Sequence, residues 1–224
     1  MIKKHIPNFI TSLNLLSGSI AVYYAFQGNY PAVFLLVILA ATFDFMDGFA
    51  ARLLKSYSPM GKELDSLADM VSFGLVPGTV AFSLLLESGL PLYFSFVGFI
   101  MTVFSALRLA KFNIDERQTS SFIGLPTPAN ALFWVGGAYS FSELLIANNW
   151  SILVLIVVFS GLLVAEIPMF SLKFKSYGWK TNQLQYIFLL VCVALLTVFQ
   201  LAAFATIIVW YILLSLIMAI SKKN

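Results

Sequence analysis

The sequence predicts an all-α, polytopic membrane protein, a bundle of about eight transmembrane helices with both termini in the cytoplasm. Of its 224 residues, 60% are hydrophobic and only 10% are charged, which leaves too little polar surface for a water-soluble domain of this length. The apolar residues come in runs that approach or reach the roughly 20 residues that a helix needs to cross the bilayer core. The basic residues, in addition, can all be placed on one side of the membrane.

Eight segments are predicted to span the bilayer, and residues 1–224 are expected to form a single membrane domain. The segments are residues 12–27, 31–54, 64–86, 91–112, 127–147, 151–171, 184–200 and 202–220. Only the dipeptide QL separates the last two, so residues 184–220 could instead form one long or re-entrant segment.

The basic residues predict the orientation. With the N-terminus in the cytoplasm, all 13 Lys and Arg residues fall on the cytoplasmic side, and the outer connections QGNY, ESGLP, ANNW and QL contain none. Such an asymmetry is typical of cytoplasmic loops and favours an even number of spans. The net charge of +3 therefore reflects membrane topology and does not indicate a nucleic-acid partner.

Four aspartates gather in the segment 43–70 of this apolar chain. Asp44 and Asp47 are three positions apart, and Asp65 and Asp69 are four apart, so each pair lies on one face of a helix. A carboxylate inside a membrane span costs at least a few kcal/mol, so such residues usually serve a function. We expect an antiparallel helical hairpin whose two acidic faces point into one cleft.

Divalent cations would remove the repulsion among four facing carboxylates, of which at least one would otherwise be protonated. Ligands that are all oxygen suit Mg²⁺ or Mn²⁺, and four shared carboxylates suit two ions. The alternative is that single aspartates cap helices or pair with Arg52, Lys55 and Lys62. That alternative explains any one aspartate more easily than all four at these spacings.

Small residues share the helical faces of the aspartates. Gly48 and Ala51 on the first helix and Gly61 on the second would leave room for a flat group against the backbone, although small residues also serve helix packing in membranes. Arg52 offers a planar fork for a phosphate. The residues thus indicate a diphosphate ligand with a bulky planar end.

This pattern resembles the signature of the CDP-alcohol phosphotransferases in full: Asp44-x-x-Asp47-Gly48-x-x-Ala51-Arg52, eight residues, then Gly61-x-x-x-Asp65-x-x-x-Asp69. The resemblance implies a membrane enzyme that displaces CMP from a CDP-linked lipid or alcohol with the help of two divalent ions. It implies that the four aspartates hold the metals and that Asp69 is also the general base. It further implies that the two glycines and the alanine accommodate the cytidine and that the arginine contacts the diphosphate.

Further segments resemble the integral-membrane phosphatidylserine synthases of bacteria and archaea. They are IPNFITSLNLLSG at 6–18, SFG at 72–74, RLAKFN at 108–113, FIGLPTPANA at 122–131 and, with two unexpected residues, EIPMFSLK at 166–173. The first of these approaches the nucleotide in the family, which implies nucleotide contacts for Asn8 and Thr11. The resemblance implies CDP-diacylglycerol and L-serine as substrates, phosphatidylserine and CMP as products, a bacterial or archaeal cell membrane, and a homodimer surrounded by membrane lipids. The active site is expected to open to the cytoplasm, because Arg52 and Gly61 lie near the inner membrane face.

The residues that would select serine are less clear from the sequence. Serine presents a carboxylate, for which Arg108 is the first candidate, and Lys62, Lys111 and Asn113 are alternatives. Arg108 could instead extend its side chain to the lipid headgroups. Glu143 and Glu166, in or near spans, have no assigned role, and each could meet a polar partner in the bundle.

Two other functions stay open at this point. The protein could be another CDP-alcohol phosphotransferase that makes phosphatidylglycerol phosphate, an inositol lipid or archaetidylserine. A different class is a cation transporter, whose aspartates would bind ions in transit. Transporters usually bind ions in broken helices within internal repeats, and the sequence shows neither a repeat nor a second acidic pair.

Overall fold

The structure, a computed structural model, describes residues 5–115, 117, 122–170, 178–179 and 182–221. In these residues it is built from helices, joined by short connections and one isolated β-bridge between Ile123 and Pro168. The elements are α1 (Ile6–Phe26), α2 (Tyr30–Leu53), α3 (Pro59–Asp69), η2 (Met70–Leu75), α4 (Val76–Glu87), α5 (Leu92–Ser95), α6 (Gly98–Ile114), α7 (Thr127–Ala147), α8 (Asn149–Val164), α9 (Gln183–Phe199), η5 (Gln200–Ala202) and α10 (Ala203–Ser221). The predicted all-α membrane fold is confirmed.

Turn residues at two places form the N-terminal helical hairpins. Asn29 caps α2, because its side-chain oxygen accepts a hydrogen bond from the backbone N–H of Ala32 at 3.2 Å. Ser58 caps α3 in the same way through the N–H of Gly61 at 3.0 Å, and Pro59 occupies the first helical position, where its missing N–H is not needed. The chain therefore reverses between α2 and α3, as the sequence predicted.

The rod formed by α3, η2 and α4 is continuous but contains a turn of π-helix at Met70–Leu75. A π-helical turn widens the helix, interrupts its regular backbone hydrogen bonds and often marks a functional site. The Thr102 hydroxyl of α6 donates a hydrogen bond at 3.2 Å to the backbone oxygen of Gly74. The wide turn begins directly after Asp69 and is packed against a neighbouring helix.

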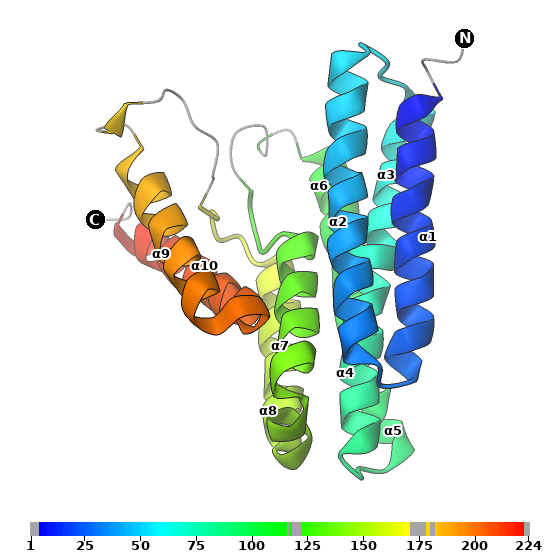
Figure 1. Ribbon diagram of the computed structural model, residues 1–224, viewed down its shortest axis with the longest axis vertical. Coiled ribbons are helices and arrows are strands. Elements are labelled where there is room, and N and C mark those ends of the chain that lie inside the picture. The colour runs from blue at the N-terminus through cyan, green and yellow to red at the C-terminus, as the bar shows by residue number, and fades with distance from the viewer. Residues whose placement is uncertain (1–4, 116, 118–121, 171–177, 180–181, 222–224) are drawn as a thin grey trace.

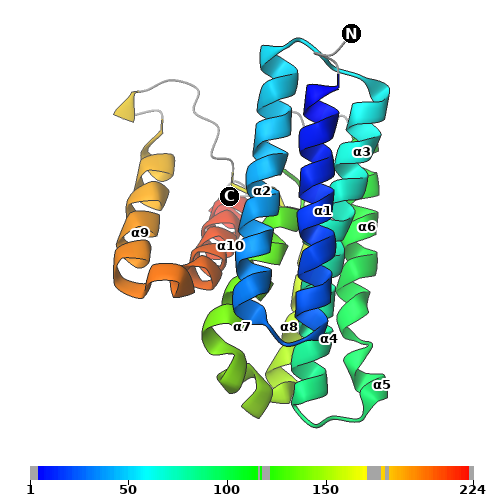
Figure 2. The ribbon, with the colours of Figure 1, turned by 45° about the vertical axis from the view of Figure 1, so that its right-hand side comes forward.

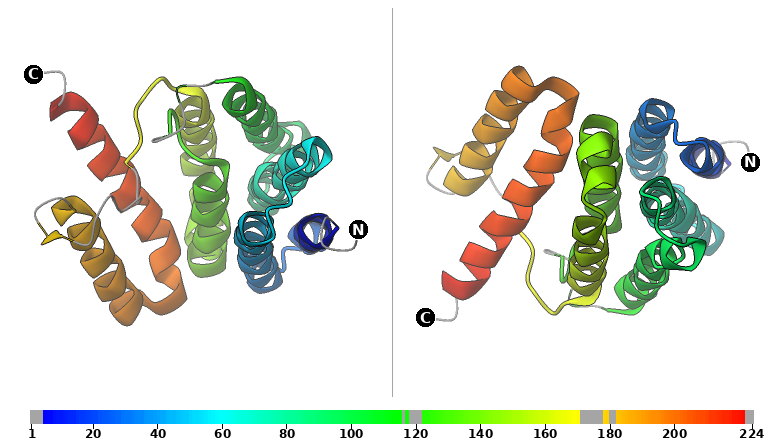
Figure 3. Two further views of the ribbon diagram at one scale, coloured as in Figure 1. Left: turned by 90° about the horizontal axis from the view of Figure 1, so that it is seen from above. Right: turned by 90° about the horizontal axis from the view of Figure 1, so that it is seen from below.

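The helices are arranged in three groups. Figure 3, which views the bundle along its length, shows α7 and α8 between the group of α1, α2, α3, α4 and α6 on one side and the pair α9 and α10 on the other. Fully buried side chains such as Phe34, Phe73 and Trp134 pack between these groups. Figure 2 shows α9 standing apart from the N-terminal helices. Most of its exposed side chains, among them Leu190 and Val193, are apolar, as expected for contact with lipid.

The observed helices correct three predicted boundaries. α1 begins at Ile6 rather than at residue 12, α3 begins at Pro59 rather than at residue 64, and α8 ends at Val164 rather than at residue 171. Residues 165–170 leave the helix because they pair with the segment before α7. The N–H of Gly124 donates to the oxygen of Ile167 at 2.9 Å, and the N–H of Met169 donates to the oxygen of Phe122 at 2.8 Å. We call residues 122–126 and 165–170 together the strap.

Residues 184–220, for which one or two segments were possible, form two helices. A short 3₁₀ turn, η5, separates α9 from α10, and Gln200 there has a positive φ of 51°. Within the described residues, five helical ranges are long and apolar enough to cross a membrane: 6–26, 30–53, 59–87, 92–114 and 183–221, the last of which contains α9, η5 and α10. The count of eight spans stays a prediction.

The helix directions agree with the expected topology. Figure 1 shows the N-terminal end of α1 and the turn between α2 and α3 at one end of the bundle, and the turns after α1 and α4 at the other. Arg52, Lys55 and Lys62 belong to the first of these ends. Seven of the basic residues lie outside the described residues: Lys3, Lys4, Lys173, Lys175, Lys180, Lys222 and Lys223. Which end faces the cytoplasm remains a prediction.

Candidate active site

Three of the four aspartates meet between α2 and α3. One carboxylate oxygen each from Asp44, Asp47 and Asp65 lies within 4.8 Å of the other two. Asp47 is only 6% exposed, and the other two are partly buried. The expected approach of two acidic helical faces is therefore observed, and it arises from the helical spacing together with the reversal at Ser58 and Pro59.

These carboxylates fit a divalent metal. Among the described residues, Asp47 Oδ2 and Asp65 Oδ1 are buried and have no hydrogen-bond partner. Buried carboxylate oxygens without a donor are strongly unfavourable unless a cation compensates them. Because the ligand atoms are all oxygens, the hard ions Mg²⁺ and Mn²⁺ suit the cluster.

Asp69 lies beside this group, one turn beyond Asp65. Its charge interacts with those of Asp44 and Asp65, and its Oδ1 accepts a hydrogen bond from Asn14 Nδ2 at 3.4 Å. Asn14, on α1, is fully buried. The sequence shows Asn14 only as a polar residue in an apolar run, and nothing in it predicts a contact with a residue 55 positions away.

The contact between α1 and η2 holds Asn14 in place. The Ser72 hydroxyl, in the π-helical turn, donates a hydrogen bond at 3.1 Å to the backbone oxygen of Asn14. A Cβ on Gly18 would lie 2.2 Å from that hydroxyl oxygen, so the two helices approach too closely for any larger residue. The π-helical turn thus contributes to the surroundings of Asp69.

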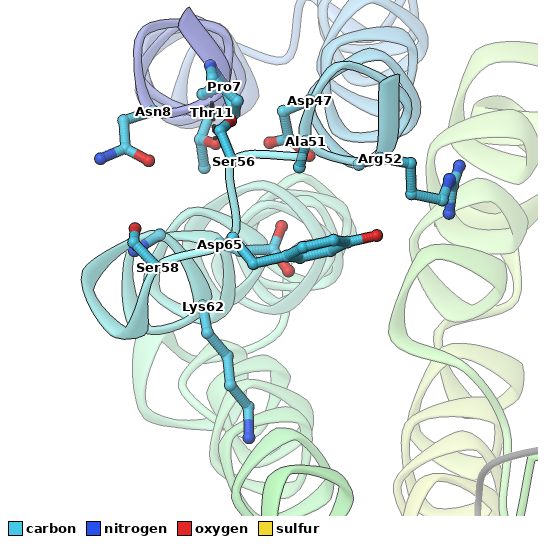
Figure 4. A pocket seen from close by; sticks show the side chains of 13 residues that line it. Pro7, Asn8, Thr11, Asp47, Ala51, Arg52, Ser56, Ser58, Lys62 and Asp65 are labelled. Atoms are coloured by element: carbon cyan, nitrogen blue, oxygen red, sulfur yellow. Dashed lines mark hydrogen bonds between the residues drawn. The ribbon is translucent and has the colours of Figure 1, made fainter. Parts of the chain in front are cut away.

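A cavity of about 270 Å³ opens beside Asp47 and Asp65 (Figure 4). It is lined by all six residues expected at the nucleotide: Asn8, Thr11, Gly48, Ala51, Arg52 and Gly61. It is also lined by Lys62, expected at the substrate, and by four residues for which the sequence suggested no role: Pro7, Ser56, Tyr57 and Ser58. These four come from the N-terminus of α1 and from the α2–α3 turn, whose path could not be read from residue spacing.

The missing side chain has a different effect at each of the two glycines that line the cavity. A Cβ on Gly48 would meet nothing within 4 Å, so the absence of a side chain there keeps the cavity open. A Cβ on Gly61 would lie 3.0 Å from both Asn8 Oδ1 and Ser58 Oγ. Gly61 therefore permits the close approach of α1 and the cap of α3.

Arg108 lies inside the protein. It is only 5% exposed, which shows that the alternative of an extension to the headgroups is wrong. Its Nε donates to the backbone oxygen of Leu125 at 3.2 Å, and its guanidinium carbon lies 4.9 Å and 5.6 Å from the ring centres of Phe112 and Phe122. Among the described residues, its Nη2 is buried without a hydrogen-bond partner.

The other candidates for serine selection have polar partners. Lys111 forms an ion pair with Glu166, and Asn113 Nδ2 donates to Ser66 Oγ at 2.8 Å. Lys62 Nζ donates to the backbone oxygen of Asn113 at 3.3 Å. The structure therefore brings Lys62 and Asn113 together and places Lys111 in a separate contact.

Glu166 is part of the strap and not of a membrane helix. The hydrogen bond and the charge of Lys111 hold the pKa of the Glu166 carboxyl below its usual range. Arg117 also approaches Glu166, at 3.5 Å. Lys111 and Arg117 are therefore the polar partners of Glu166. Glu143, in contrast, is exposed near the end of α7.

Comparison with known proteins identifies the family. The family described as CDP-alcohol phosphatidyltransferase matches residues 4–220, nearly the whole chain. This protein belongs to that family. The match extends beyond the signature in α2 and α3 to the helices that surround it.

Three relatives within this CDP-alcohol phosphatidyltransferase family carry the name CDP-diacylglycerol–serine O-phosphatidyltransferase. The protein of Bacillus subtilis (strain 168) is 35% identical over 143 residues, which cover 64% of this chain and 80% of the relative. That of Helicobacter pylori (strain 26695) is 30% identical over 204 residues, 86% of this chain and 81% of the relative. That of Methanocaldococcus jannaschii is 34% identical over 163 residues, which cover 73% of this chain and 75% of the relative.

Proposed function

We propose that this membrane protein transfers the phosphatidyl group of CDP-diacylglycerol to the hydroxyl of L-serine, with phosphatidylserine and CMP as products. The observation that carries the proposal is the meeting of Asp44, Asp47 and Asp65 beside a cavity lined by the small residues and the arginine of the family signature. The names of the three relatives support serine as the alcohol.

The four aspartates of the signature would hold two divalent ions, Mg²⁺ or Mn²⁺. When bound, the ions would neutralise charge on the diphosphate and on the departing CMP. Asp47 and Asp65 each have a buried oxygen free for this role within the described residues. Asp44, which lies within 4.8 Å of both, completes the observed group.

The cavity would bind the nucleotide half of the lipid substrate. The open space beside Gly48 leaves the backbone of α2 accessible to the flat cytosine base, next to Ala51. Asn8 and Thr11 supply polar groups from α1, and Gly61 lets α1 approach. Arg52 would pair with the diphosphate through its planar fork.

The transfer would be one displacement at phosphorus. Asp69 accepts the proton of the serine hydroxyl, the serine oxygen forms a bond to the β-phosphorus of the lipid, and the bond from that phosphorus to the oxygen of CMP breaks. Asn14, through its hydrogen bond to Asp69, would hold the carboxylate in the orientation that this proton transfer requires. Of the four serine-selecting candidates, Arg108 is favoured, because its Nη2 has no partner in the described residues and its charge interacts with that of Asp69.

The site would open to the cytoplasm, because the cavity lies at the end of the bundle to which Arg52, Lys55 and Lys62 belong. A homodimer is also part of the proposal, on the resemblance to the family alone.

An alcohol-specificity assay tests this function. Purified protein in vesicles that contain CDP-diacylglycerol, with Mn²⁺ or Mg²⁺, should release CMP when labelled L-serine is added and should incorporate the label into lipid. Turnover with glycerol 3-phosphate or inositol phosphate and none with serine would assign another activity within the family. Cation flux across sealed vesicles without any CMP release would favour the transporter.

A further inference from the structure

The N-terminal turn of α7 lies beside Arg108. The Arg108 side chain donates a hydrogen bond to the backbone oxygen of Leu125, two residues before the first helical residue, Thr127. Figure 1 shows α7 beginning well below the upper end of α2, so this turn lies at some depth within the bundle. The strap fixes it there, because the N–H of Leu125 donates to the oxygen of Leu162 at 2.8 Å.

In the described part of the chain, no side chain caps this end of α7. The residue before the helix is Pro126, which has no capping group, and no side-chain hydrogen bond is made there. The backbone N–H groups of Thr127 and Ala129 have no acceptor within the helix, and Pro128 has no N–H to satisfy. The uncapped N-terminus of this helix, which runs without a break from Thr127 to the kink at Phe141, carries partial positive charge and favours an anion.

Buried polar side chains without partners surround the same turn. Among the described residues, Arg108 Nη2, Thr127 Oγ1 and both polar atoms of the Asn130 side chain lack hydrogen bonds. Asn130 is fully buried, Thr127 is 1% exposed and Arg108 is 5% exposed. The ion pairs within the described part of the chain involve Lys111 and Arg117, not Arg108. Unsatisfied donors of this kind, next to a buried cation and a helix N-terminus, indicate a small anionic ligand.

We propose that Arg108 and the N-terminal turn of α7 bind the carboxylate of the amino-acid substrate. This inference rests on the proposed function and assigns Thr127 and Asn130, in addition to Arg108, to the alcohol end of the site. Because the charge of Arg108 interacts with that of Asp69, the carboxylate of serine would lie at this turn with its hydroxyl directed toward Asp69. The amide oxygen of Asn130 is available to the substrate ammonium group.

The test compares L-serine with serinol, in which a CH₂OH group replaces the carboxylate. Steady-state rates are measured for the full-length protein and for the Arg108→Lys, Arg108→Gln, Thr127→Val and Thr127→Ser variants. Thr79→Val is the matched control for Thr127→Val, because Thr79 is equally buried but its hydroxyl bonds to the backbone oxygen of Leu75 in the adjoining η2 turn. The Michaelis constant for CDP-diacylglycerol is measured for every variant as a check on the nucleotide end.

We expect Arg108→Gln and Thr127→Val to lower kcat/KM for serine by about 10- to 100-fold while that for serinol changes less than about threefold. Arg108→Lys and Thr127→Ser should recover part of the loss, and the Michaelis constant for CDP-diacylglycerol should stay within about twofold. An equal loss with serine and serinol, in Thr127→Val or in Arg108→Lys, would overturn the inference and leave the proposed function intact. A wild-type protein that does not use serine would overturn the proposed function itself.

Discussion

At the scale of single residues, spacing predicts which side chains share a helical face but not which distant residues meet them. Asp44 and Asp47 were placed together with Arg52 because they share one helical face, and the resemblance to the family added Asn8 and Thr11. Asn14 was missed, because its contact with Asp69 depends on how α1 packs against η2. Contacts of this kind are decided by tertiary packing, which residue spacing does not encode.

Asn14→Leu should lower kcat for phosphatidyl transfer by about 10- to 100-fold and leave the Michaelis constant for CDP-diacylglycerol within about threefold. The physical reason is that leucine has no N–H to hold the Asp69 carboxylate. Ser12→Ala is the control on the same helix, because the Ser12 hydroxyl donates a hydrogen bond to the backbone oxygen of Asn8 on an exposed face. Steady-state kinetics with both substrates varied provide the measurement. An unchanged kcat, or a loss confined to lipid binding, would contradict the positioning role.

At the scale of elements, the helices themselves were predictable and their exact ends were not. The apolar run of α8 continues past Val164 in the sequence, but the helix ends there because Ile167 and Met169 hydrogen-bond to Gly124 and Phe122. The π-helical turn after Asp69 likewise has no signal in the residue types. Both features depend on partners that lie on other elements.

Gly124→Ala should destabilise the protein more than Gly89→Ala. Both glycines have a positive φ, 77° and 78°, so each substitution adds backbone strain of about 1 kcal/mol. A Cβ at Gly124 would in addition lie 2.6 Å from the backbone oxygen of Leu163, whereas one at Gly89 would meet nothing within 4 Å. Thermal unfolding in detergent should therefore show a lower midpoint for Gly124→Ala than for Gly89→Ala. Equal midpoints would show that the strap can shift at little cost.

At the scale of the whole molecule, composition and the positions of basic residues predicted a polytopic helical protein, and the structure and the family confirm the membrane fold. The arrangement in three groups could not be predicted, because apolar helices of similar composition carry little information about their neighbours. The apolar residues of α9 illustrate this point: they would have suited a buried helix as well as the exposed one that is observed.

Cysteine labelling tests the orientation. Two single-cysteine variants, Asn148→Cys and Glu63→Cys, are made in a Cys192→Ser background. Asn148 lies in the exposed connection after α7, and Glu63 lies on the exposed face of α3 near the cavity. A membrane-impermeant maleimide added to intact cells should label the first and not the second, because the basic end of the bundle is expected to face the cytoplasm. The reverse labelling pattern would invert the topology.

The strap also sets an order of assembly. Its two segments, residues 122–126 and 165–170, precede α7 and follow α8 in the chain. The N-terminal turn of α7 therefore acquires its support only when Leu162 of α8 and the second segment are in place. The aspartates of α2 and α3 enter the membrane much earlier during synthesis. A partly synthesised chain would therefore already contain the residues for metal and nucleotide while the turn beside Arg108 was still unsupported.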